Sequence, residues 1–596
     1  MLDSLDLIIF LASIAFTMGA GFMASRSKAD SEDYFMAGRS IPWWGVAGSV
    51  FGTNVSANHL VGMLGIGFSV GFAQSHYELG AILAILLMAY FFLPVYRRLK
   101  ITTLSEYLAM RFGPSLGLIY SITLLILILV QLAAAFYIGS RTLGLLLLDS
   151  PLEVSYGAGI ITLMIITAGY TMIGGLRAVV ITDVIQSVLL LFSGLLISFL
   201  VFNQPEVGGF FQMLAEDRSL PQAEQKMKLF LPSDHPDLPW SGVFTGLMVL
   251  HFFFWTNNQY LVQRVLAAKS EREAKVGLLV GAFLKLLVPF FSVAAGVAAA
   301  TFFRAKVPGL EVAPDAAFPI LVGMIVPAGI GLIGIITAGL LGAIISSLDS
   351  MLNSASTLFT IDIYNKYIQK EKNTYQSVLA GRFFLVALVL TSGLLAFTTY
   401  DPQSKDNFFL TLSKQGSYFT PGLVAAFLAG IFFPRTSSKA ALICVLSSFP
   451  LSFGIELLYD NVLINVEGVT ALLGDNLNFL HRTMLVFLFS LMILFVFADK
   501  EPDEAYSEYS WQADGNGSRF LKFGIMMLLS QVIIITFSGI GFVPGILAGF
   551  SSFIVAIALG HRYVAKTAGF RKAFFDDRFL ASLILGATCA IFAFFA

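Results

Sequence analysis

The chain has 596 residues, of which 57% are hydrophobic and 12% are charged, and its formal net charge is −1. Soluble domains carry about 25% charged residues, so this composition excludes an ordinary soluble globular protein. The charges occur in short clusters between apolar runs of about 20 residues, the length of a membrane-spanning helix. The sequence therefore predicts a polytopic membrane protein of the all-α class.

About sixteen apolar segments are long enough to be membrane spans. No basic region precedes the first one, so we expect a retained helix and not a cleavable signal peptide. The segments lie near 5–23, 43–67, 77–96, 116–146, 155–173, 179–203, 241–262, 273–303, 327–360, 377–399, 408–433, 438–458, 483–498, 521–539, 542–560 and 579–596. The two cysteines, Cys444 and Cys589, lie inside such segments and offer neither a disulfide framework nor a thiolate metal site.

Lysine and arginine are distributed unevenly among the loops between these segments. Every second loop is basic, starting with the loop after the first segment; later basic loops include Arg97, Arg177 and Arg264. Basic loops favour the cytoplasmic side, so sixteen crossings place the N-terminus on the non-cytoplasmic side of a plasma (inner) membrane. A weak contrary sign is the glycosylation triplet at 516–518, which falls in a loop predicted to be cytoplasmic.

The stretch 43–81 departs most clearly from an ordinary span. Residues 52–59 read Gly-Thr-Asn-Val-Ser-Ala-Asn-His, which concentrates polar side chains inside an apolar run. Hydrocarbon offers these groups no partners, so they must face protein or a water-filled cavity. Such interruptions are typical of the broken helices with which transporters bind ions and substrates. The alternative for any one of these side chains is a hydrogen bond between packed helices.

The spans indicate an internal symmetry. Five spans occupy 43–203 and five more occupy 241–433, and an odd number gives two units of opposite orientation. The first span of each unit is interrupted, at 53–59 in one and at His251 and 256–259 in the other. The predicted organisation is an N-terminal extra helix and loop (1–42), a first inverted repeat (43–203), an external loop (204–240), a second inverted repeat (241–433) and C-terminal extra helices (434–596).

Two charged residues lie within predicted spans, Glu78 and Lys285. A charge at the bilayer centre costs about 3 kcal/mol or more, so such residues usually have a function. If both reach one cavity, the carboxylate accepts and the ammonium donates hydrogen bonds, which suits a neutral polyhydroxylated ligand. Two alternatives remain: Glu78 lies near the end of its span and can snorkel to the surface, or the two charges form a pair without contacting a ligand.

Hydroxyl groups are concentrated at 346–350, which read Ser-Ser-Leu-Asp-Ser. Adjacent hydroxyls in a span, together with carbonyls of an unwound helix, can bind a hard monovalent cation; packing of small residues between helices is the alternative. Asp183 follows the loop that contains Arg177. It is either an interfacial carboxylate paired with Arg177 or a neighbour, or a second ion or proton site.

Residues 67–71 match the G-x-S-x-G pattern of hydrolase nucleophiles, with His59 and His76 nearby. The pattern requires a strained turn and an aligned base, whereas here it lies in a glycine-rich run at a helix end. The sequence contains no H-E-x-x-H, P-loop or C-x-x-C motif. We therefore expect a protein that is not an enzyme.

Four stretches carry a resemblance to a known family: DYFMAGRSIPWWGVAGSVFGTNVSANHLVGM (33–63), GGLRAVVITDVIQ (174–186), LVQRVLAAKSEREAK (261–275) and GAIISSLDSMLNSASTLFTIDIY (342–364). With the helix around Lys285, they resemble the sugar branch of the sodium/solute symporter family, which includes bacterial sodium–galactose and animal sodium–glucose symporters. The likeness runs from about residue 5 to about 499. It implies a LeuT-like core of five plus five inverted-repeat helices, one helix before it and several after it.

The resemblance also implies roles for single residues. A sodium site formed by carbonyls of the first broken helix and hydroxyls of the eighth core helix corresponds to Gly52, Val55, Ala343, Ser346 and Ser347. Substrate contacts correspond to Asn54, His59, Glu78, Lys285, His251 and Ser413, outer gates to Met63 and Tyr77, and an inner gate to Phe254. Asp183 matches a carboxylate implicated in ion coupling. The chain departs from the family at Ala81, where a serine contacts sugar, and at Ser413, where a glutamine does.

These observations predict a secondary active transporter. It would couple inward sodium flow to the uptake of a sugar or polyol, resembling glucose, galactose or inositol, by alternating access. The expected partners are that small molecule, the sodium ion and the lipid bilayer, with no nucleic acid. The alternative is a proton-coupled symporter, or a symporter of a non-sugar solute, with the same fold. A membrane sensor is disfavoured because the longest polar stretch, about 499–519, is too short for a signalling domain.

Overall fold

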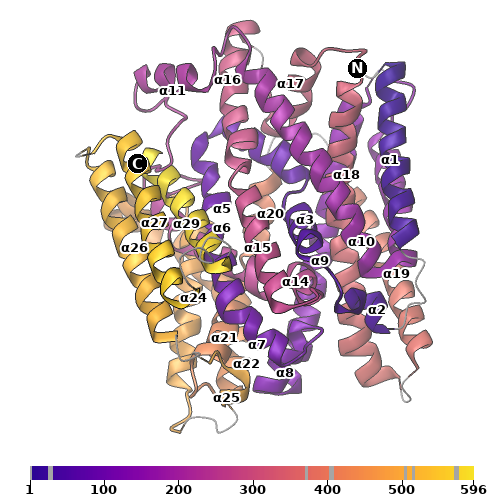
Figure 1. The fold of residues 1–596 in the computed structure, drawn as a ribbon, viewed down its shortest axis with the longest axis vertical. Helices are drawn as coiled ribbons and strands as arrows, with labels where there is room; N and C mark the ends of the chain where they lie inside the picture. Colours follow the sequence, from indigo (N-terminus) through magenta and orange to yellow (C-terminus); the bar gives the residue numbers. More distant parts are fainter. Residues whose placement is uncertain are drawn as a thin grey trace.

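The computed structural model describes residues 3–24, 31–148, 150–309, 311–369, 373–401, 408–501, 506–512, 517–541, 543–568 and 576–595. These residues form helices, connecting segments and two isolated β-bridges, so the all-α prediction is confirmed (Figure 1). Twelve helices of the described chain are long and apolar enough to cross a membrane. The count of about sixteen spans stays a prediction, because several predicted spans are divided into shorter helical pieces.

The N-terminal part contains α1, which packs against α10 and α18, and the first predicted repeat contains five predicted spans, two of them divided into shorter helical pieces. Asn516 of the glycosylation triplet and parts of several basic loops lie outside the described residues. The helices are α1 (Ser4–Ala24), α2 (Ser31–Met36), η1 (Ala37–Arg39), α3 (Trp43–Asn54), η2 (Asn58–Met63), α4 (Leu64–Ser69), η3 (Phe72–Ser75), α5 (His76–Leu79), α6 (Ala81–Leu87), η4 (Met88–Phe92), α7 (Leu93–Arg98), α8 (Leu104–Phe112), α9 (Pro114–Leu146) and α10 (Tyr156–Phe202).

The loop after α10 contains the short helix α11 (Phe210–Ser219). The second predicted repeat again starts with a divided helix. Its helices are α12 (Trp240–Val243), α13 (Gly246–Phe252), η5 (Phe253–Asn257), α14 (Gln259–Leu266), α15 (Glu271–Lys285), η6 (Pro289–Ala294), α16 (Ala295–Lys306), η7 (Pro314–Ala316), α17 (Ala317–Ile325), α18 (Leu332–Leu358), η8 (Phe359–Ile368), α19 (Thr374–Thr399), α20 (Phe408–Gly416) and α21 (Thr420–Phe432).

The C-terminal helices cover one side of this core. They are α22 (Ser438–Asn461), η9 (Leu463–Asn465), α23 (Glu467–Leu473), α24 (Phe479–Val496), α25 (Tyr506–Tyr509), α26 (Gly517–Gly539), α27 (Gly545–Ala568) and α29 (Asp577–Phe595). Figure 1 shows α26, α27 and α29 side by side at one edge of the molecule, opposite α1. Helix α29 packs against α6 and α15, so these additions are attached to the core.

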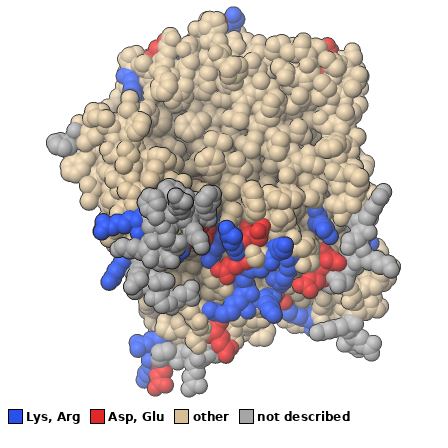
Figure 2. Space-filling model, viewed as in Figure 1, with Lys and Arg blue, Asp and Glu red and all other residues tan. Residues whose placement is uncertain are grey.

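The surface fits a membrane protein. Figure 2 shows a broad face nearly free of charged side chains, with lysine, arginine, aspartate and glutamate gathered at its lower end. Large apolar side chains are exposed on helices at opposite edges, among them Phe16, Phe383 and Phe550. Exposed apolar side chains in a continuous belt are what hydrocarbon favours and water does not.

Helix α3 lies at the centre and packs against α10, α15 and α18. Glycines allow its continuation, α4, to approach a neighbouring span closely. A β-carbon at Gly67 would lie 2.2 Å from the Val293 carbonyl oxygen, and one at Gly296 would lie 2.1 Å from the Leu64 carbonyl oxygen. The two backbones touch, and no larger residue fits at either position without displacement.

Helix α10 contains two predicted spans joined at a sharp turn. Gly175 adopts a φ of 57°, in the left-handed region that favours glycine. A β-carbon there would lie 2.6 Å from the Tyr34 carbonyl oxygen, so the segment between α1 and α3 packs directly against the turn. The turn explains why the sequence reads as two spans, 155–173 and 179–203.

Candidate functional site

The predicted break in the first core helix is present. Helix α3 ends at Asn54, Val55 leaves the helical conformation, and helical structure resumes at Asn58. The Ser56 hydroxyl accepts a hydrogen bond from the Asn58 backbone N–H at 3.2 Å, and the Ser56 N–H bonds to the Asn54 carbonyl. Side chain and backbone together satisfy part of the freed backbone, as a break inside a membrane requires.

The second predicted break is also present, at Asn258, between η5 and α14. Two buried tyrosines satisfy carbonyl groups at its edge: the Tyr120 hydroxyl donates to the Asn257 carbonyl at 2.8 Å, and the Tyr96 hydroxyl donates to the Thr256 carbonyl at 3.3 Å. Both tyrosines belong to the first predicted repeat, and they donate hydrogen bonds to carbonyl groups of the broken helix in the second repeat.

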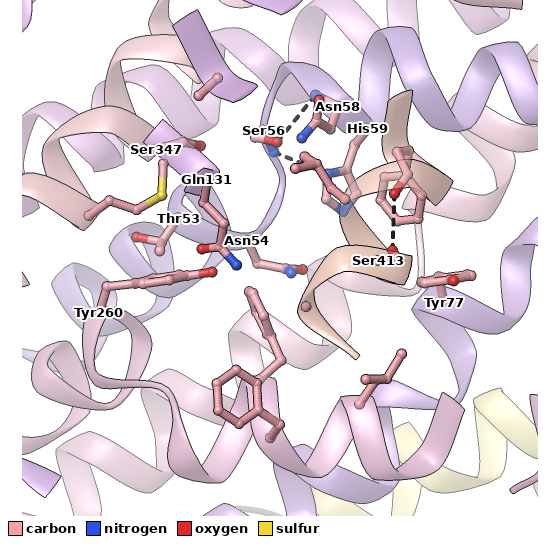
Figure 3. A pocket seen from close by; sticks show the side chains of 18 of the residues that line it. Thr53, Asn54, Ser56, Asn58, His59, Tyr77, Gln131, Tyr260, Ser347 and Ser413 are labelled. Atoms are coloured by element: carbon pink, nitrogen blue, oxygen red, sulfur yellow. Dashed lines mark hydrogen bonds between the residues drawn. The ribbon is translucent and has the colours of Figure 1, made fainter. Parts of the chain in front are cut away.

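The two broken helices border one cavity of about 230 Å³ (Figure 3). Since a single water molecule needs only about 10–15 Å³ by this measure, the cavity has room for a small molecule. Most residues singled out from the sequence line it. They are Asn54, His59, Tyr77, Glu78, His251, Phe254, Lys285, Ser347 and Ser413.

Six other predicted residues do not line this cavity. Met63 is fully buried on η2, behind the cavity wall. The remaining five are Gly52, Val55, Asp183, Ala343 and Ser346, which lie where α3, α10 and α18 meet.

A chain of polar contacts crosses the cavity wall. Lys285 Nζ lies 2.6 Å from Glu78 Oε2 and donates to Asn54 Oδ1 at 2.7 Å. His59 Nε2 lies 3.3 Å from the other carboxylate oxygen, Glu78 Oε1. The Glu78 and Lys285 side chains are only 1% and 2% exposed. Glu78 is therefore not a snorkelling surface carboxylate. Glu78 and Lys285 form an ion pair with each other, and both side chains also line the cavity.

Aromatic rings close the cavity on two sides. The Phe409 ring lies 4.9 Å from the Tyr77 ring and 6.1 Å from the His59 ring, between centroids. Phe254 lies against Tyr260 and Trp255 at 5.8 and 5.5 Å. Aromatic walls of this kind give a ligand apolar surface to stack on while the polar chain supplies hydrogen bonds.

His251 and Ser413 also face the cavity. His251 Nε2 lies 3.3 Å from the His76 carbonyl oxygen, and the Ser413 hydroxyl donates to the Phe409 carbonyl at 3.0 Å (Figure 3). His251 is thus oriented by a carbonyl group of α5, whereas the Ser413 hydroxyl bonds to the preceding turn of its own helix, α20.

The predicted cation ligands gather at the junction of α3 and α18. A β-carbon at Gly52 would lie 3.2 Å from Ser346 Oγ, so the end of α3 and the Ser346 hydroxyl are close neighbours. Ser347 Oγ faces the cavity and donates to the Ala343 carbonyl at 3.1 Å. The described residues contain no group of three or more His, Cys, Asp and Glu side chains arranged for a metal ion. Hydroxyl and carbonyl oxygens suit a hard cation rather than a transition metal.

Asp183 is buried and pairs with Arg264, a residue that the distribution of basic residues had assigned to a loop. Its Oδ2 lies 3.5 Å from Arg264 Nε and accepts from Ser49 Oγ at 2.5 Å, and its Oδ1 accepts from Ser346 Oγ at 2.5 Å. Arg264 is 0% exposed and also bonds to Ser350 Oγ. The sequence interpretation placed Arg264 in a basic loop and, in one of two alternatives, paired an interfacial Asp183 with Arg177 or a neighbour. In the structure Arg177 is exposed, and Arg264 is the buried partner.

The hydrolase pattern at 67–71 has no catalytic geometry. The Ser69 hydroxyl donates to the Gly65 carbonyl at 3.0 Å, an ordinary bond to the preceding helical turn. His59 faces Glu78, and His76 Nε2 lies 2.8 Å from the Leu229 carbonyl. Both imidazoles are committed elsewhere, so neither is aligned as a base for this serine.

Sequence reasoning missed several residues of the wall. Gln131 on α9 and Tyr260 on α14 extend into the cavity beside Asn54 (Figure 3), and Phe409 and Thr420 complete it. Gln131 is a single polar residue in a long apolar span, which was the one available signal. Nothing in the sequence distinguishes Tyr260 or Phe409 from the other aromatic residues.

Comparison with known proteins identifies relatives of the whole core. The profile of the Sodium:solute symporter family matches residues 34–447. The sodium/glucose cotransporter of Vibrio parahaemolyticus is 34% identical over 475 residues, covering 76% of this chain and 85% of that protein. The sodium/myo-inositol cotransporter 2 of Mus musculus is 32% identical over 472 residues, covering 74% and 68%.

A solved structure supports the fold. A Na⁺-coupled sialic acid symporter in a substrate-bound outward-open state superposes with a TM-score of 0.69 at 22% identity, covering 83% of this chain and 97% of that one. At this identity the likeness concerns the fold, and the LeuT-like architecture expected from the sequence is confirmed.

The buried pair makes a testable prediction about stability. Removing one partner of a buried ion pair leaves an unpaired charge and costs about 3–5 kcal/mol. We expect Lys285→Met to lower the melting temperature of the purified protein strongly, and adding Glu78→Gln to restore part of the loss. The matched control is Lys306→Met, which breaks the more exposed Lys306–Glu206 pair and should cost at most about 1 kcal/mol. Equal effects of Lys285→Met and Lys306→Met would contradict the burial argument.

Proposed function

Because this chain belongs to the Sodium:solute symporter family, whose members are transporters and not enzymes, we propose that it couples inward sodium flow to the uptake of a sugar or polyol by alternating access. The single observation that carries the proposal is the buried Glu78–Lys285 pair in the wall of a cavity beside a broken helix. Relatives named for glucose and myo-inositol transport support a neutral polyhydroxylated substrate.

The substrate would bind among Asn54, His59, Glu78 and Lys285, with His251 and Ser413 as further contacts. Glu78 and Lys285 balance each other's charge, so the wall offers strong donors and acceptors without a net charge to attract an ionic solute. Hydrogen bonds to charged groups are stronger than neutral ones, and a ring of hydroxyls can satisfy both partners at once. Gln131 and Tyr260 would complete this set from the opposite wall.

Sodium would bind between the end of α3 and α18. The proposed ligands are carbonyl oxygens of Gly52, Val55 and Ala343 and the hydroxyls of Ser346 and Ser347. The proximity of Gly52 to Ser346 and the orientation of Ser347 toward the cavity support this assignment. Asp183 is proposed as a second ion or coupling site; its pairing with Arg264 means that a cation there would have to share the carboxylate.

Gating would follow from the rings that border the cavity. We assign Met63 and Tyr77 to the outer gate and Phe254 to the inner gate.

Sodium must bind the outward-open state more tightly than the inward-open state, since equal affinities shift no equilibrium. One charge crossing 100 mV supplies about 2.3 kcal/mol, and a tenfold sodium gradient adds about 1.4 kcal/mol. The sum, about 3.7 kcal/mol, would concentrate a neutral solute about 500-fold.

The protein is an integral multi-pass membrane protein, as the family and the apolar helices require. Residence in the plasma (inner) membrane and a non-cytoplasmic N-terminus are proposals, supported by the alternation of basic loops. The division into 1–42, 43–203, 204–240, 241–433 and 434–596 is likewise proposed; the two broken helices that begin the second and fourth parts support it.

A proton-coupled symporter, or one for a non-sugar solute, is the second candidate. It would use Glu78 or Asp183 as the titrating carboxylate. Each carboxylate has a buried cation beside it, Lys285 and Arg264 respectively, so a proton that binds the carboxylate would leave that cation without its ion-pair partner. This arrangement favours sodium coupling.

Uptake into proteoliposomes tests the function directly. We expect accumulation of at least one labelled neutral hexose or inositol under an inward sodium gradient, and none when potassium replaces sodium. A sugar acid and an amino sugar serve as charged controls and should be poor substrates. Uptake driven by a pH gradient without sodium would overturn sodium coupling in favour of the second candidate.

Replacement of one hydroxyl tests the sodium site. Ser347→Ala removes a proposed cation ligand and should raise the sodium concentration for half-maximal uptake about tenfold, the effect of about 1.4 kcal/mol, while sugar affinity at saturating sodium changes little. The matched control is Ser392→Ala, a buried serine on α19 that bonds only to the preceding helical turn. An unchanged sodium dependence in Ser347→Ala would remove this residue from the site.

Labelling from one side tests the orientation. Single cysteines at Ser219, in the loop between the proposed repeats, and at Lys269, in the connection between α14 and α15, lie at opposite ends of the predicted span 241–262. With the N-terminus outside, an impermeant thiol reagent added to intact cells should label the cysteine at 219 and not that at 269. The reverse pattern would invert the proposed topology.

A further inference from the structure

Helix α20 separates two hollows. Residues on one face, Leu412, Ser413 and Gly416, line the cavity described above. Residues on the other face, Leu410 and Lys414, line a larger hollow that is also bordered by the loop at 223–226 and 235–237. A helix of nine residues is therefore the wall between the binding cavity and a hollow beneath the loop between the repeats.

Helix α20 also supplies the ring that closes the cavity on this side. Phe409 packs on Tyr77 and His59, and its Cβ lies 3.1 Å from where a β-carbon of Gly62 would be. A solute passing between the two hollows on this side would meet Phe409, and a tilt of α20 away from η2 and α5 would move the ring out of its path.

The point about which α20 can tilt is a break in its helix. The sequence predicts one span over 408–433, but α20 ends at Gly416 and α21 begins at Thr420. Two of the three residues between them contact α22. The hydroxyl of Ser452 on α22 donates to the Tyr418 carbonyl at 3.1 Å, and the ring of Phe449, also on α22, stacks on Phe419 with centroids 4.9 Å apart.

A buried arginine on α24 makes several polar contacts with the break and with the end of α20. Arg482 is 1% exposed, and its guanidinium lies 3.7 Å from the centre of the Tyr418 ring. It donates to Ser417 Oγ at 2.7 Å and to the Lys414 carbonyl at 3.5 Å, and it forms an ion pair with Glu456 on α22. Glu456 also accepts from the Tyr418 hydroxyl and lies 3.6 Å from Lys414 Nζ.

We propose that Arg482 is a positioning residue for transport, which holds the break at 417–419 so that α20 keeps Phe409 and Ser413 against the cavity. The proposal rests on the proposed function, because it assigns the break a part in the transport cycle. A planar guanidinium presents five N–H groups at fixed angles, and here they reach a carboxylate, a hydroxyl and a carbonyl at the end of α20. A lysine keeps the charge but cannot satisfy these acceptors together.

In this proposal, two helices outside the five-plus-five core, α22 and α24, hold the break between α20 and α21. Helices α22 and α24 lie in the proposed C-terminal part, yet Glu456 lies 3.6 Å from Lys414 Nζ in the last turn of α20, and Arg482 donates to Ser417 within the break. A buried arginine is costly unless paired. Arg482 finds its partners at the break and on α22, while its Nε has no hydrogen-bond partner among the described residues.

The test measures how often the wall opens. In the full-length protein with Cys444→Ser and Cys589→Ser, which removes two buried thiols, a single Leu412→Cys reports access to the cavity side of α20. An impermeant methanethiosulfonate is added outside intact cells, in sodium without sugar. We expect Arg482→Lys to speed labelling about tenfold, as expected when a charge-assisted hydrogen bond is lost, and Ser417→Ala to act in the same direction.

The matched control is Arg578→Lys, which alters a bidentate arginine–carboxylate pair on α29, far along the chain from the break. It should leave the labelling rate unchanged. The proposal is overturned if Arg482→Lys and Ser417→Ala both label at the parent rate, or if Arg578→Lys speeds labelling equally. If Arg482→Lys does not reach the membrane, Ser417→Ala alone decides.

The labelling experiment does not require transport. Its result can therefore contradict the role of Arg482 without contradicting sodium-driven uptake, and the reverse also holds. If the parent shows no sodium-driven uptake of any neutral solute and labelling still responds to Arg482→Lys, the proposed function is wrong and the wall remains a gate for another solute. If uptake is sodium-driven and labelling does not respond, the assignment of Arg482 is wrong. In the positive case, the KM for the solute should change little in Arg482→Lys, because a tenfold rise in a small open fraction leaves most molecules in the closed form.

Discussion

The absence of hydrogen-bonding partners in hydrocarbon is the constraint on which this structure depends. An unsatisfied backbone group there costs several kcal/mol, so a helix can break within the bilayer only where protein or enclosed water replaces the lost bonds. The break after Asn54 and the break at Asn258 both meet this condition, through Ser56 in one case and through Tyr96 and Tyr120 in the other. Because both breaks must face inward, a polar cavity between them follows from the same requirement.

The two buried ion pairs extend this argument from the backbone to the side chains. Glu78 on α5 pairs with Lys285 on α15, and Asp183 on α10 pairs with Arg264 on α14. Each pair therefore joins the first proposed repeat to the second. Neutralisation across the repeat boundary removes the cost of isolated charge and at the same time fixes how the two halves meet around α3.

Sequence reasoning was most successful where a local pattern carried the information. The breaks were predictable because polar residues within an apolar span have few explanations, and the enclosed Glu78 and Lys285 were predictable because a charge in a span is rarely accidental. Arg264 was misplaced because loop counting uses distance along the chain, whereas a short helix after the break returns this residue to the interior. Tyr260 has no distinctive neighbours in sequence, and only tertiary packing identifies it. Gln131, a polar residue among apolar ones, and the break at 417–419, which lies between Gly416 and Pro421, carried signals that the span count did not use.

The two ion pairs also differ in what can change them. The Glu78–Lys285 pair borders a cavity, so a solute can add hydrogen bonds to both partners without separating them. The Asp183–Arg264 pair is sealed, with both side chains 0% exposed, and can change only when helices move. Separating a buried pair outright costs about 3–5 kcal/mol, comparable to the roughly 3.7 kcal/mol that one sodium ion can supply. A cycle driven by one ion must therefore keep Asp183 paired as α14 moves relative to α10, or exchange Arg264 for another cation at the moment of movement.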